Sequence, residues 1–287
     1  MSLKPYRVTG EYQIKLKEFD TEAPAGAKEK KADYQKKTGE NLLKISELQD
    51  RFYSEGKEGL VIILQAMDAA GKDSTIKHVM GGINPQGVVV HSFKEPSDEE
   101  LAHDFLWRAV TEMPERGKIA IFNRSYYEDV LIVRVRKLYQ NYKMAERCLG
   151  DDIIRKRYRH IRNYEDFLYE NSYRTVKIFL HLSKDEQKKR FLERIDKKIK
   201  NWKFSTSDLK ERALWNEYQK AYEDAINETA TKQSPWYVLP ADNKWYTRYL
   251  VSEVLLDILK KIDPHYPEMP PEEQAQLARD REILTGE

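Results

Sequence analysis

A strand-like apolar run, a loop of small residues and a Gly-Lys pair follow one another in the segment LVIILQAMDAAGKDST, residues 60–75. This order is typical of a phosphate-binding loop, in which backbone N–H groups surround the phosphates and the Lys side chain reaches their outer oxygens. The usual pattern is GxxxxGK followed by Ser or Thr, but here Ala66 replaces the first Gly and Asp73 replaces the hydroxyl residue. The segment still constrains the fold strongly, because such a loop joins the end of a sheet strand to the start of a helix.

The loop carries two carboxylates, Asp68 and Asp73. A carboxylate beside a polyphosphate is repulsive unless a cation lies between them, and Mg²⁺ prefers carboxylate, phosphate and water oxygens. We therefore expect both side chains to act on metal or on its waters. The alternative is a degenerate motif, in which Asp73 only caps the following helix and Lys72 is solvated. If the motif is genuine, the residues expected to bind phosphate are Ala69, Ala70, Gly71, Lys72, Asp73, Ser74 and Thr75.

The composition indicates a water-soluble protein without disulfides. Of the 287 residues, 40% are hydrophobic and 34% are charged, and the mean hydropathy is -0.78. The longest apolar runs have the length of strands, and the N-terminal MSLKPYRVTG lacks the apolar core of a signal peptide, so we expect a cytoplasmic protein with no membrane partner. Cys148 is the only cysteine, which excludes an intrachain disulfide. A net charge of +2 argues against nucleic acid as a partner but leaves room for a local basic region.

Five apolar strand patterns alternate with helical patterns along the chain. The strands are expected at residues 60–65, 88–93, 119–122, 176–182 and 236–239, and capping boxes at 97–100 and 183–186 open two of the helices. The alternation predicts a doubly wound α/β fold: a five-stranded parallel sheet sandwiched by helices, with ligands outside the carboxyl ends of the strands. We expect a single domain over residues 1–287.

Three parts of this domain lie outside the sheet layers. The N-terminal extension, residues 1–58, contains a helical apolar repeat that Gly56 ends, at Leu42, Ile45, Leu48 and Phe52. Residues 184–215 are expected to form a lid. Residues 264–287 contain clustered prolines and charges, which favour an extended peripheral arm.

A second polar cluster follows the strand expected at 119–122. The sequence there is Asn123-Arg124-Ser125-Tyr126-Tyr127-Glu128-Asp129. Because this strand and the strand before the first loop end at the same edge of the sheet, the two clusters should meet. Arg124 suits bidentate phosphate binding, whereas Glu128 and Asp129 suit metal binding or acceptor positioning. The alternative is an ordinary helix start, with Ser125 as the cap and the acids favoured by the helix dipole.

The region expected to form the lid is strongly basic. Residues 184–203 contain nine Lys or Arg and four Asp or Glu, a local charge of +5, and Arg190 and Arg194 share one helix face. A basic lid that closes over a transferring phosphoryl group would use these charges; a solvated helix face is the alternative. A second basic stripe, with Arg155, Arg159 and Arg162, lies opposite an apolar one, and there a solvated face is favoured unless the ligand is long.

Taken together, these residues resemble the second family of polyphosphate kinases. The blocks that carry the resemblance are AMDAAGKD, FNRSYYEDV, HLSKDEQKKRFLER, WKFSTSD and PWYVLPADNKWY, which span nearly the whole chain. The resemblance implies a P-loop kinase fold like that of thymidylate kinases, with a helical lid. It also implies phosphoryl transfer between inorganic polyphosphate and nucleotides, with Mg²⁺ as cofactor and Mn²⁺ as the alternative. Relatives assemble as dimers or tetramers, so a homo-oligomer is expected.

The resemblance also implies a set of site residues. The residues expected in catalysis are Asp68, Lys72, Arg124, Arg190 and Arg194; those added to the phosphate and nucleotide site are Asn123, Tyr127 and Glu128; those expected along polyphosphate are Arg155, Arg159, Lys203 and Arg212; and those expected on metal are Asp68, Asp73 and Asp129. The Tyr-Glu-Asp form of the second cluster is similar to the branch that accepts both AMP and ADP. ATP would then be formed from ADP, and ADP from AMP.

Phosphoryl transfer of this kind is consistent with the residue types. The acceptor oxygen of AMP or ADP is already an anion, so the site must mainly hold two polyanions in line and screen their repulsion. His160 and His181 are accordingly interpreted as structural. Two other functions stay open at this point: an ATP-dependent nucleotide kinase of similar fold, and a non-catalytic P-loop protein that binds a polyanion or RNA. Base preference and the direction of the reaction have no signature in the sequence.

Overall fold

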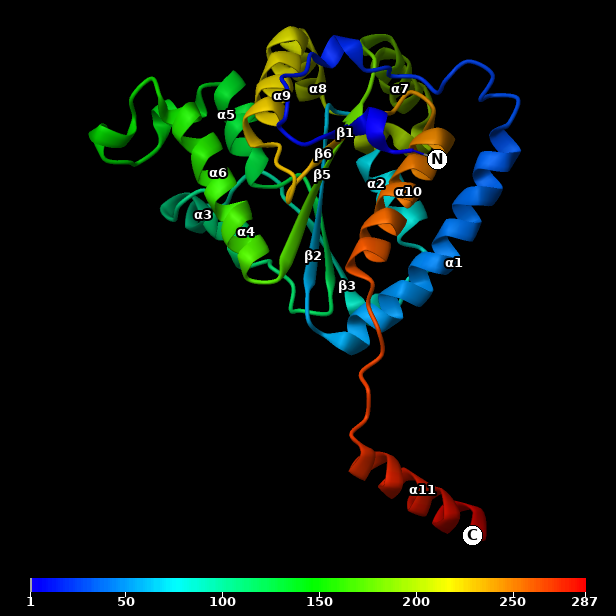
Figure 1. The fold of residues 1–287 in the computed structure, drawn as a ribbon. Coiled ribbons are helices and arrows are strands. Elements are labelled where there is room, and N and C mark those ends of the chain that lie inside the picture. The colour runs from blue at the N-terminus through cyan, green and yellow to red at the C-terminus, as the bar shows by residue number, and fades with distance from the viewer. Residues whose placement is uncertain (1) are drawn as a thin grey trace.

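The computed structural model describes residues 2–287, and its centre is a six-stranded sheet with helices on both faces (Figure 1). The strands follow the order β1-β6-β5-β2-β4-β3, and β2 to β6 are parallel while β1 is antiparallel to β6. Their bounds are β1 Arg7–Val8, β2 Gly59–Ala66, β3 Val88–Ser92, β4 Ile119–Asn123, β5 Tyr173–His181 and β6 Trp236–Pro240. The five predicted parallel strands are confirmed; β1, with two residues, is too short to produce a sequence pattern.

Side chains of the buried central strand β2 divide between two cores. Leu60 and Ile62 pack with one layer of helices, and Val61 and Ile63 pack with the other, because successive side chains of a strand point to opposite faces. The first layer contains α1, α2 and α10, and the second contains α4, α5, α6 and α9 (Figure 1). The bounds of the helices are α1 Lys31–Glu55, α2 Lys72–Val79, α3 Asp98–Ala102, α4 Trp107–Val110, α5 Ile132–Val135, α6 Ile153–Glu170, α7 Lys184–Asp196, α8 Thr206–Ala213, α9 Trp215–Thr229, α10 Lys244–Ile262 and α11 Pro271–Gly286.

The predicted N-terminal helix is confirmed as α1. Ile45 and Phe52 are buried against α10, and Gly56 ends the helix in the left-handed conformation with φ of 64°. Residues 2–30 are not helical in the same way: they contain β1 and two short 3-10 turns. Met1, the first residue of the predicted extension, lies outside the described residues. The capping box at Ser97 is present, whereas at Ser183 only the half in which the Ser accepts a hydrogen bond from Glu186 is formed.

The C-terminal arm differs from the prediction of an extended chain. Residues 271–286 form α11, which projects away from the body, while the preceding residues are extended (Figure 1). Pro271 at the first helical position and Glu272 and Glu273 in the first turn favour a helix start there. The proline cluster therefore separates α11 from α10 and does not prevent helix formation. Within residues 2–287, no helix combines the length and the apolar character that crossing a membrane requires.

Candidate active site

The phosphate-binding loop connects β2 to α2 at the carboxyl edge of the sheet. β2 lies between β5 and β4, so the loop emerges at the centre of the molecule. Gly71 is the N-cap of α2, with φ of 103°, and Ala69 also has a positive φ, of 63°. A non-glycine residue in this region costs about 1 kcal/mol or more and is retained where the surrounding structure holds it. The strained conformation at Ala69 is thus a sign of a shaped binding loop.

Lys72 extends back across this loop. Its Nζ donates a hydrogen bond to the carbonyl oxygen of Ala66, at 3.1 Å. Burial, and after it the nearby positive charge of Arg124, lower the pKa of Lys72 to about 8. The alternative in which Lys72 is solvated does not describe this structure. Nor does Asp73 cap α2, because the cap residue is Gly71 and no side chain bonds there.

The two polar clusters meet, as the sequence predicts. The Nδ2 of Asn123 donates to Asp73 at 2.7 Å. The guanidinium of Arg124 donates to Asp68 at 2.9 Å and to Glu128 at 3.2 Å. The second cluster therefore neutralises Asp68 of the first cluster and holds Asp73 by a hydrogen bond, while Arg124 also pairs with Glu128 of its own cluster. The negative charge of Glu128 is the main reason that the pKa of Arg124 is raised, so this guanidinium stays charged.

Arg124 is itself held in an unusual backbone conformation. Its φ is 65°, and its N–H donates to the carbonyl of Leu64 in β2. Ser125 then accepts a hydrogen bond from the N–H of Tyr127 and opens the short 3-10 helix η4, Tyr126–Val130. The helix-start interpretation of this segment is therefore correct for Ser125, and it coexists with the meeting of the two clusters.

A cavity of about 230 Å³ lies between the two clusters and the lid region. Asp68, Arg124 and Glu128 line it from the sheet side, and Asp208 and Glu211 of α8 line it from the lid side. Burial raises the pKa of Asp208, and the negative charge of Asp68 acts in the same direction. The sequence prediction gave no role to Asp208 or Glu211. Asp208 lies in WKFSTSD, one of the blocks that carry the family resemblance, and this block could have indicated a role for it.

The carboxylates of Asp68 and Asp73 suit a hard divalent cation. One oxygen of Asp68 accepts from Arg124 and one oxygen of Asp73 accepts from Asn123, so each carboxylate keeps a second oxygen for a metal or its waters. Within residues 2–287, no three His, Cys, Asp or Glu side chains gather closely enough to hold a metal ion without other ligands. A cation between Asp68 and Asp73 would therefore need phosphate and water oxygens to complete its coordination.

Asp129 does not join this pair, which corrects its prediction as a metal ligand. Its carboxylate is buried and accepts a hydrogen bond from Arg157 at 2.7 Å, and burial raises its pKa to about 6. It lines a second cavity, of about 560 Å³, together with Arg108, Tyr142 and other residues of α3, α4 and α6. A 3-10 helix turns by about 120° per residue, so the adjacent Glu128 and Asp129 face the two different cavities.

Tyr127 is not accessible to a ligand, which corrects its prediction as a nucleotide-binding residue. Its side chain is fully buried, and its hydroxyl bonds to Glu165 and Thr229 at 2.9 Å each. The hydroxyl of Tyr126 also bonds to Glu165, and the amine of Lys177 forms a buried ion pair with the same carboxylate. This buried network fixes the position of Tyr126 and Tyr127 in the second cluster. A lysine inside the apolar strand YRTVKIFLH was the sequence signal for this network.

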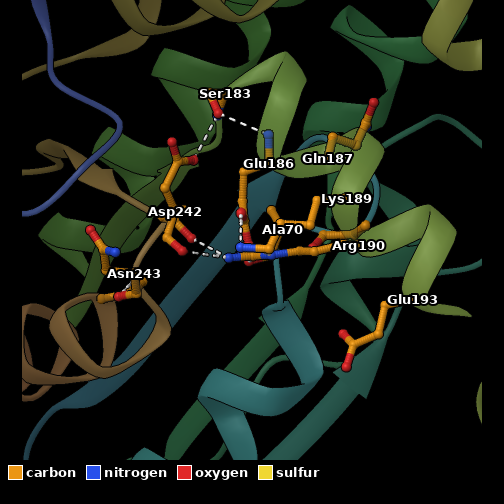
Figure 2. A network of polar contacts seen from close by, with 12 residues as sticks. Ala70, Ser183, Glu186, Gln187, Lys189, Arg190, Glu193, Asp242 and Asn243 are labelled. Carbon is orange, nitrogen blue, oxygen red and sulfur yellow. Dashed lines mark hydrogen bonds and ion pairs between the residues drawn. The ribbon is translucent and has the colours of Figure 1, made fainter.

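The predicted basic residues fall into three environments. Arg190 is buried and contacts the loop from behind, as Figure 2 shows. Arg194 donates to the carbonyl of Lys203 at 3.0 Å and lies within the lid, whereas Arg212 of α8 donates to Lys184 and to Gln187 of α7. Arg155 and Arg159 lie on the exposed face of α6 and line neither of the two cavities. Of the remaining loop residues, Ser74 accepts from Arg248 and Thr75 is buried beneath the loop.

The chain is similar to known proteins in sequence and in fold. A family model described as Polyphosphate kinase 2 matches residues 28–267. The chain is 48% identical over 258 residues to the ADP-polyphosphate phosphotransferase of Rhodopseudomonas palustris, with 89% of each chain covered. It is 44% identical over 269 residues to the AMP/ADP-polyphosphate phosphotransferase of Meiothermus ruber, covering 93% of this chain and 96% of that one. The crystal structure of Polyphosphate Kinase 2 from Arthrobacter aurescens TC1 superimposes with a TM-score of 0.86 at 38% identity, with 97% of both chains covered.

Proposed function

The chain belongs to the polyphosphate kinase 2 family, and from this premise we propose that it transfers phosphoryl groups between inorganic polyphosphate and adenine nucleotides. The observation that carries the proposal is the meeting of the two clusters through Arg124–Asp68 and Asn123–Asp73. This arrangement sets the cationic groups of Arg124 and Lys72 beside carboxylates that can share a metal. Such a site can hold two polyanions close together.

Different residues of the site would bind and position the two phosphate chains. Lys72 would leave its carbonyl partner Ala66 and bind the transferring phosphoryl group. Arg124 would bind a phosphate of the nucleotide while Glu128 and Asp68 hold its guanidinium in place. Arg194 and Lys203 would bring positive charge from the lid. Because the acceptor is already an anion, the reaction needs no strong general base among these residues.

A divalent cation fits beside Asp68 and Asp73, and Mg²⁺ is the ion we propose, with Mn²⁺ as the alternative. When bound, the cation reduces the repulsion between the two phosphate chains. Asp73 would keep its hydrogen bond from Asn123, which fixes the carboxylate, and Asp68 would keep its contact with Arg124. The two carboxylates replace the missing hydroxyl of the usual motif.

We propose that the cavity of about 560 Å³ receives the nucleoside part of the acceptor. Its volume is in the range of small-molecule sites. Asp129 of η4 lines it and the adjacent Glu128 lines the cavity of about 230 Å³, and we propose that a nucleotide whose base lies in the larger cavity extends its phosphates toward Arg124. Both AMP and ADP are proposed as acceptors, in agreement with the name of the relative from Meiothermus ruber, an AMP/ADP-polyphosphate phosphotransferase.

One matrix of donors and acceptors tests this function. Purified protein is incubated with polyphosphate or with ATP as donor, each against AMP, ADP and GDP, and the nucleotide products are separated by chromatography. We expect ATP from ADP and ADP from AMP when polyphosphate is the donor. Transfer that requires ATP and ignores polyphosphate would contradict the proposal and favour an ordinary nucleotide kinase. The absence of any transfer would favour a protein that only binds polyanions.

A further inference from the structure

The guanidinium of Arg190 uses every hydrogen-bond donor that it has. An arginine carries five N–H donors. Nε donates to Glu186 at 2.9 Å; Nη1 donates to the carbonyls of Ala69 and Ala70 at 3.0 and 2.8 Å; Nη2 donates to the carbonyls of Ala241 and Asp242 at 2.7 and 3.0 Å. Figure 2 shows these contacts converging from α7, the phosphate-binding loop and the segment after β6.

A side chain in this state has no donor left for a substrate phosphate. Arg190 is 5% exposed, and moving it toward a substrate would take the donor away from four backbone carbonyls, of which those of Ala70 and Ala241 are buried. Arg194, one turn later on α7, is different: its Nη1 donates to Lys203 and Asp208, and among residues 2–287 its Nε and Nη2 have no hydrogen-bond partner. Arg194 can therefore offer donors to a substrate, whereas Arg190 serves the protein itself.

Gln187 adds a third contact of the same kind. Its Nε2 donates to the carbonyl of Asp68 at 2.9 Å, and the side chain is 1% exposed. Gln187 and Arg190 lie three positions apart on α7 and so share a helix face. Together they hold the carbonyls of three consecutive loop residues, Asp68, Ala69 and Ala70.

The direction of these carbonyls determines where the loop N–H groups point. In a planar trans peptide, the N–H of one residue points opposite to the C=O of the residue before it. Because the carbonyls of Asp68 and Ala70 face α7, the N–H groups of Ala69 and Gly71 point away from it. The N–H of Ala70, which lies between them, donates to the carbonyl of Met67 at 3.3 Å, so the N–H groups of Ala69 and Gly71 are the ones that can form an anion site in this loop. The side chains of α7 thus set the shape that a phosphate would meet.

The lid is connected to the same contact. Arg212 of α8 donates from Nη1 to the Oε1 of Gln187 at 2.9 Å and to the carbonyl of Lys184 at 2.7 Å. A displacement of α8 would break the hydrogen bond that the Oε1 of Gln187 accepts from Arg212. The Nε2 of the same amide donates to the carbonyl of Asp68. The position of α8 and the shape of the loop are therefore linked through the amide side chain of Gln187.

We propose that Gln187 and Arg190 are positioning residues, which hold the carbonyls of residues 68–70 and thereby direct the loop N–H groups toward the phosphates, with Arg212 linking this contact to the lid. The proposal rests on the proposed function, because it takes the ligand of the loop to be a phosphate chain. It replaces the role of Arg190 as a catalytic residue that touches the transferring group.

The test compares three variants on the substrate-free protein. Arg190→Lys keeps the charge but has too few donors for the five acceptors, Gln187→Met keeps the volume but loses the amide, and Arg194→Lys is the matched control on the same helix. Backbone NMR shifts and amide hydrogen exchange are measured for residues 69–71, and binding of inorganic tripolyphosphate is measured by calorimetry.

We expect Arg190→Lys and Gln187→Met to shift the loop resonances, to raise exchange of the Ala70 amide, which donates to Met67, by about tenfold or more, and to weaken tripolyphosphate binding. Arg194→Lys should leave the loop resonances of the free protein unchanged and should lower kcat with polyphosphate more than it changes nucleotide KM. Unchanged loop amides in both Arg190→Lys and Gln187→Met would overturn the proposal. Loss of the fold in both would also overturn it, because the residues would then support the whole domain.

These measurements are independent of turnover. If the wild-type protein transferred no phosphoryl group from polyphosphate, the proposed function would fail while the loop amides still reported on Gln187 and Arg190. Normal transfer by wild-type protein together with unchanged loop amides in both variants would contradict the positioning role alone.

Discussion

Lys72 has the most strongly constrained chemistry of the individual residues in the site. Burial and the charge of Arg124 lower its pKa from 10.5 to about 8, and its amine already bonds to the loop carbonyl of Ala66. The protonated amine is the form that attracts a phosphoryl oxygen. The site therefore loses a cation as the pH rises through about 8, whereas an ordinary lysine would keep it.

We expect kcat/KM for ADP, at fixed polyphosphate, to fall on the alkaline side with an apparent pKa near 8. In Lys72→Arg the different geometry of the guanidinium should lower the rate. Because this side chain stays charged, the alkaline decrease should move to higher pH. Rates measured across the pH range with both proteins check this. An alkaline decrease at the same pH in both proteins would assign the titration to another group.

At the scale of residues, the sequence was sufficient to predict those parts of the site that depend on residues close to one another in the chain. Asp68, Lys72 and Asp73 belong to one loop, and Asn123 and Arg124 follow one strand, so spacing and strand order were sufficient to bring them together. The burial of Tyr127 on Glu165 and the pairing of Asp129 with Arg157 depend on helix α6, far along the chain. No pattern within the second cluster carries that information.

At the scale of elements, η4 rests on a buried polar network that must stay fully paired. Glu165 accepts from Tyr126, Tyr127 and Lys177, and the amine of Lys177 also donates to the carbonyl of Thr229. Both charged side chains are buried almost completely. A buried charge that loses its partner is costly, while replacement of the whole pair by apolar groups often is not.

We expect Glu165→Gln to lower the free energy of unfolding by about 3 kcal/mol, since it leaves the Lys177 amine without a counter-charge. The loss should shrink as the pH rises, because the buried amine can then release its proton. The double variant Glu165→Gln with Lys177→Met should recover part of the loss. Urea unfolding at several pH values measures all three effects. A loss of similar size in both variants and at every pH would show that the pair charge is not its cause.

In α7 the sequence pattern predicts the helix face, but tertiary contacts decide the environment of each residue. The helical face of Arg190 and Arg194 was predictable from their spacing, and it is confirmed in α7. That one arginine bonds to the loop while the next stays within the lid could not be predicted, because it depends on how closely α7 approaches residues 68–70. Equal spacing on a helix does not give equal environments.

At the scale of the whole molecule, the parallel sheet and its two helical layers follow directly from the alternation of strand and helix patterns. The edge strand β1 and the helical form of the arm were not predicted. β1 is too short to show a period, and α11 has no buried side chain that would produce an apolar repeat. Both lie at the periphery, where few side chains are buried and the sequence therefore shows little apolar periodicity.

We expect removal of residues 271–287 to change the free energy of unfolding by no more than about 0.5 kcal/mol. No residue of α11 is buried, so the body loses no packing. Thermal and urea unfolding of the truncated and full chains at several protein concentrations check this. A large loss of stability that depends on concentration would indicate that α11 packs against another copy.

The central claim is that the site between the two clusters takes a phosphoryl group from polyphosphate. The most direct test follows ³²P from uniformly labelled polyphosphate to ADP, with Lys72→Ala as the control and circular dichroism as the check on its fold. We predict label in the terminal phosphate of ATP with the wild-type protein, and transfer slower by about two orders of magnitude or more in Lys72→Ala. Label that stays in polyphosphate, or equal transfer in a folded Lys72→Ala variant, would contradict the claim.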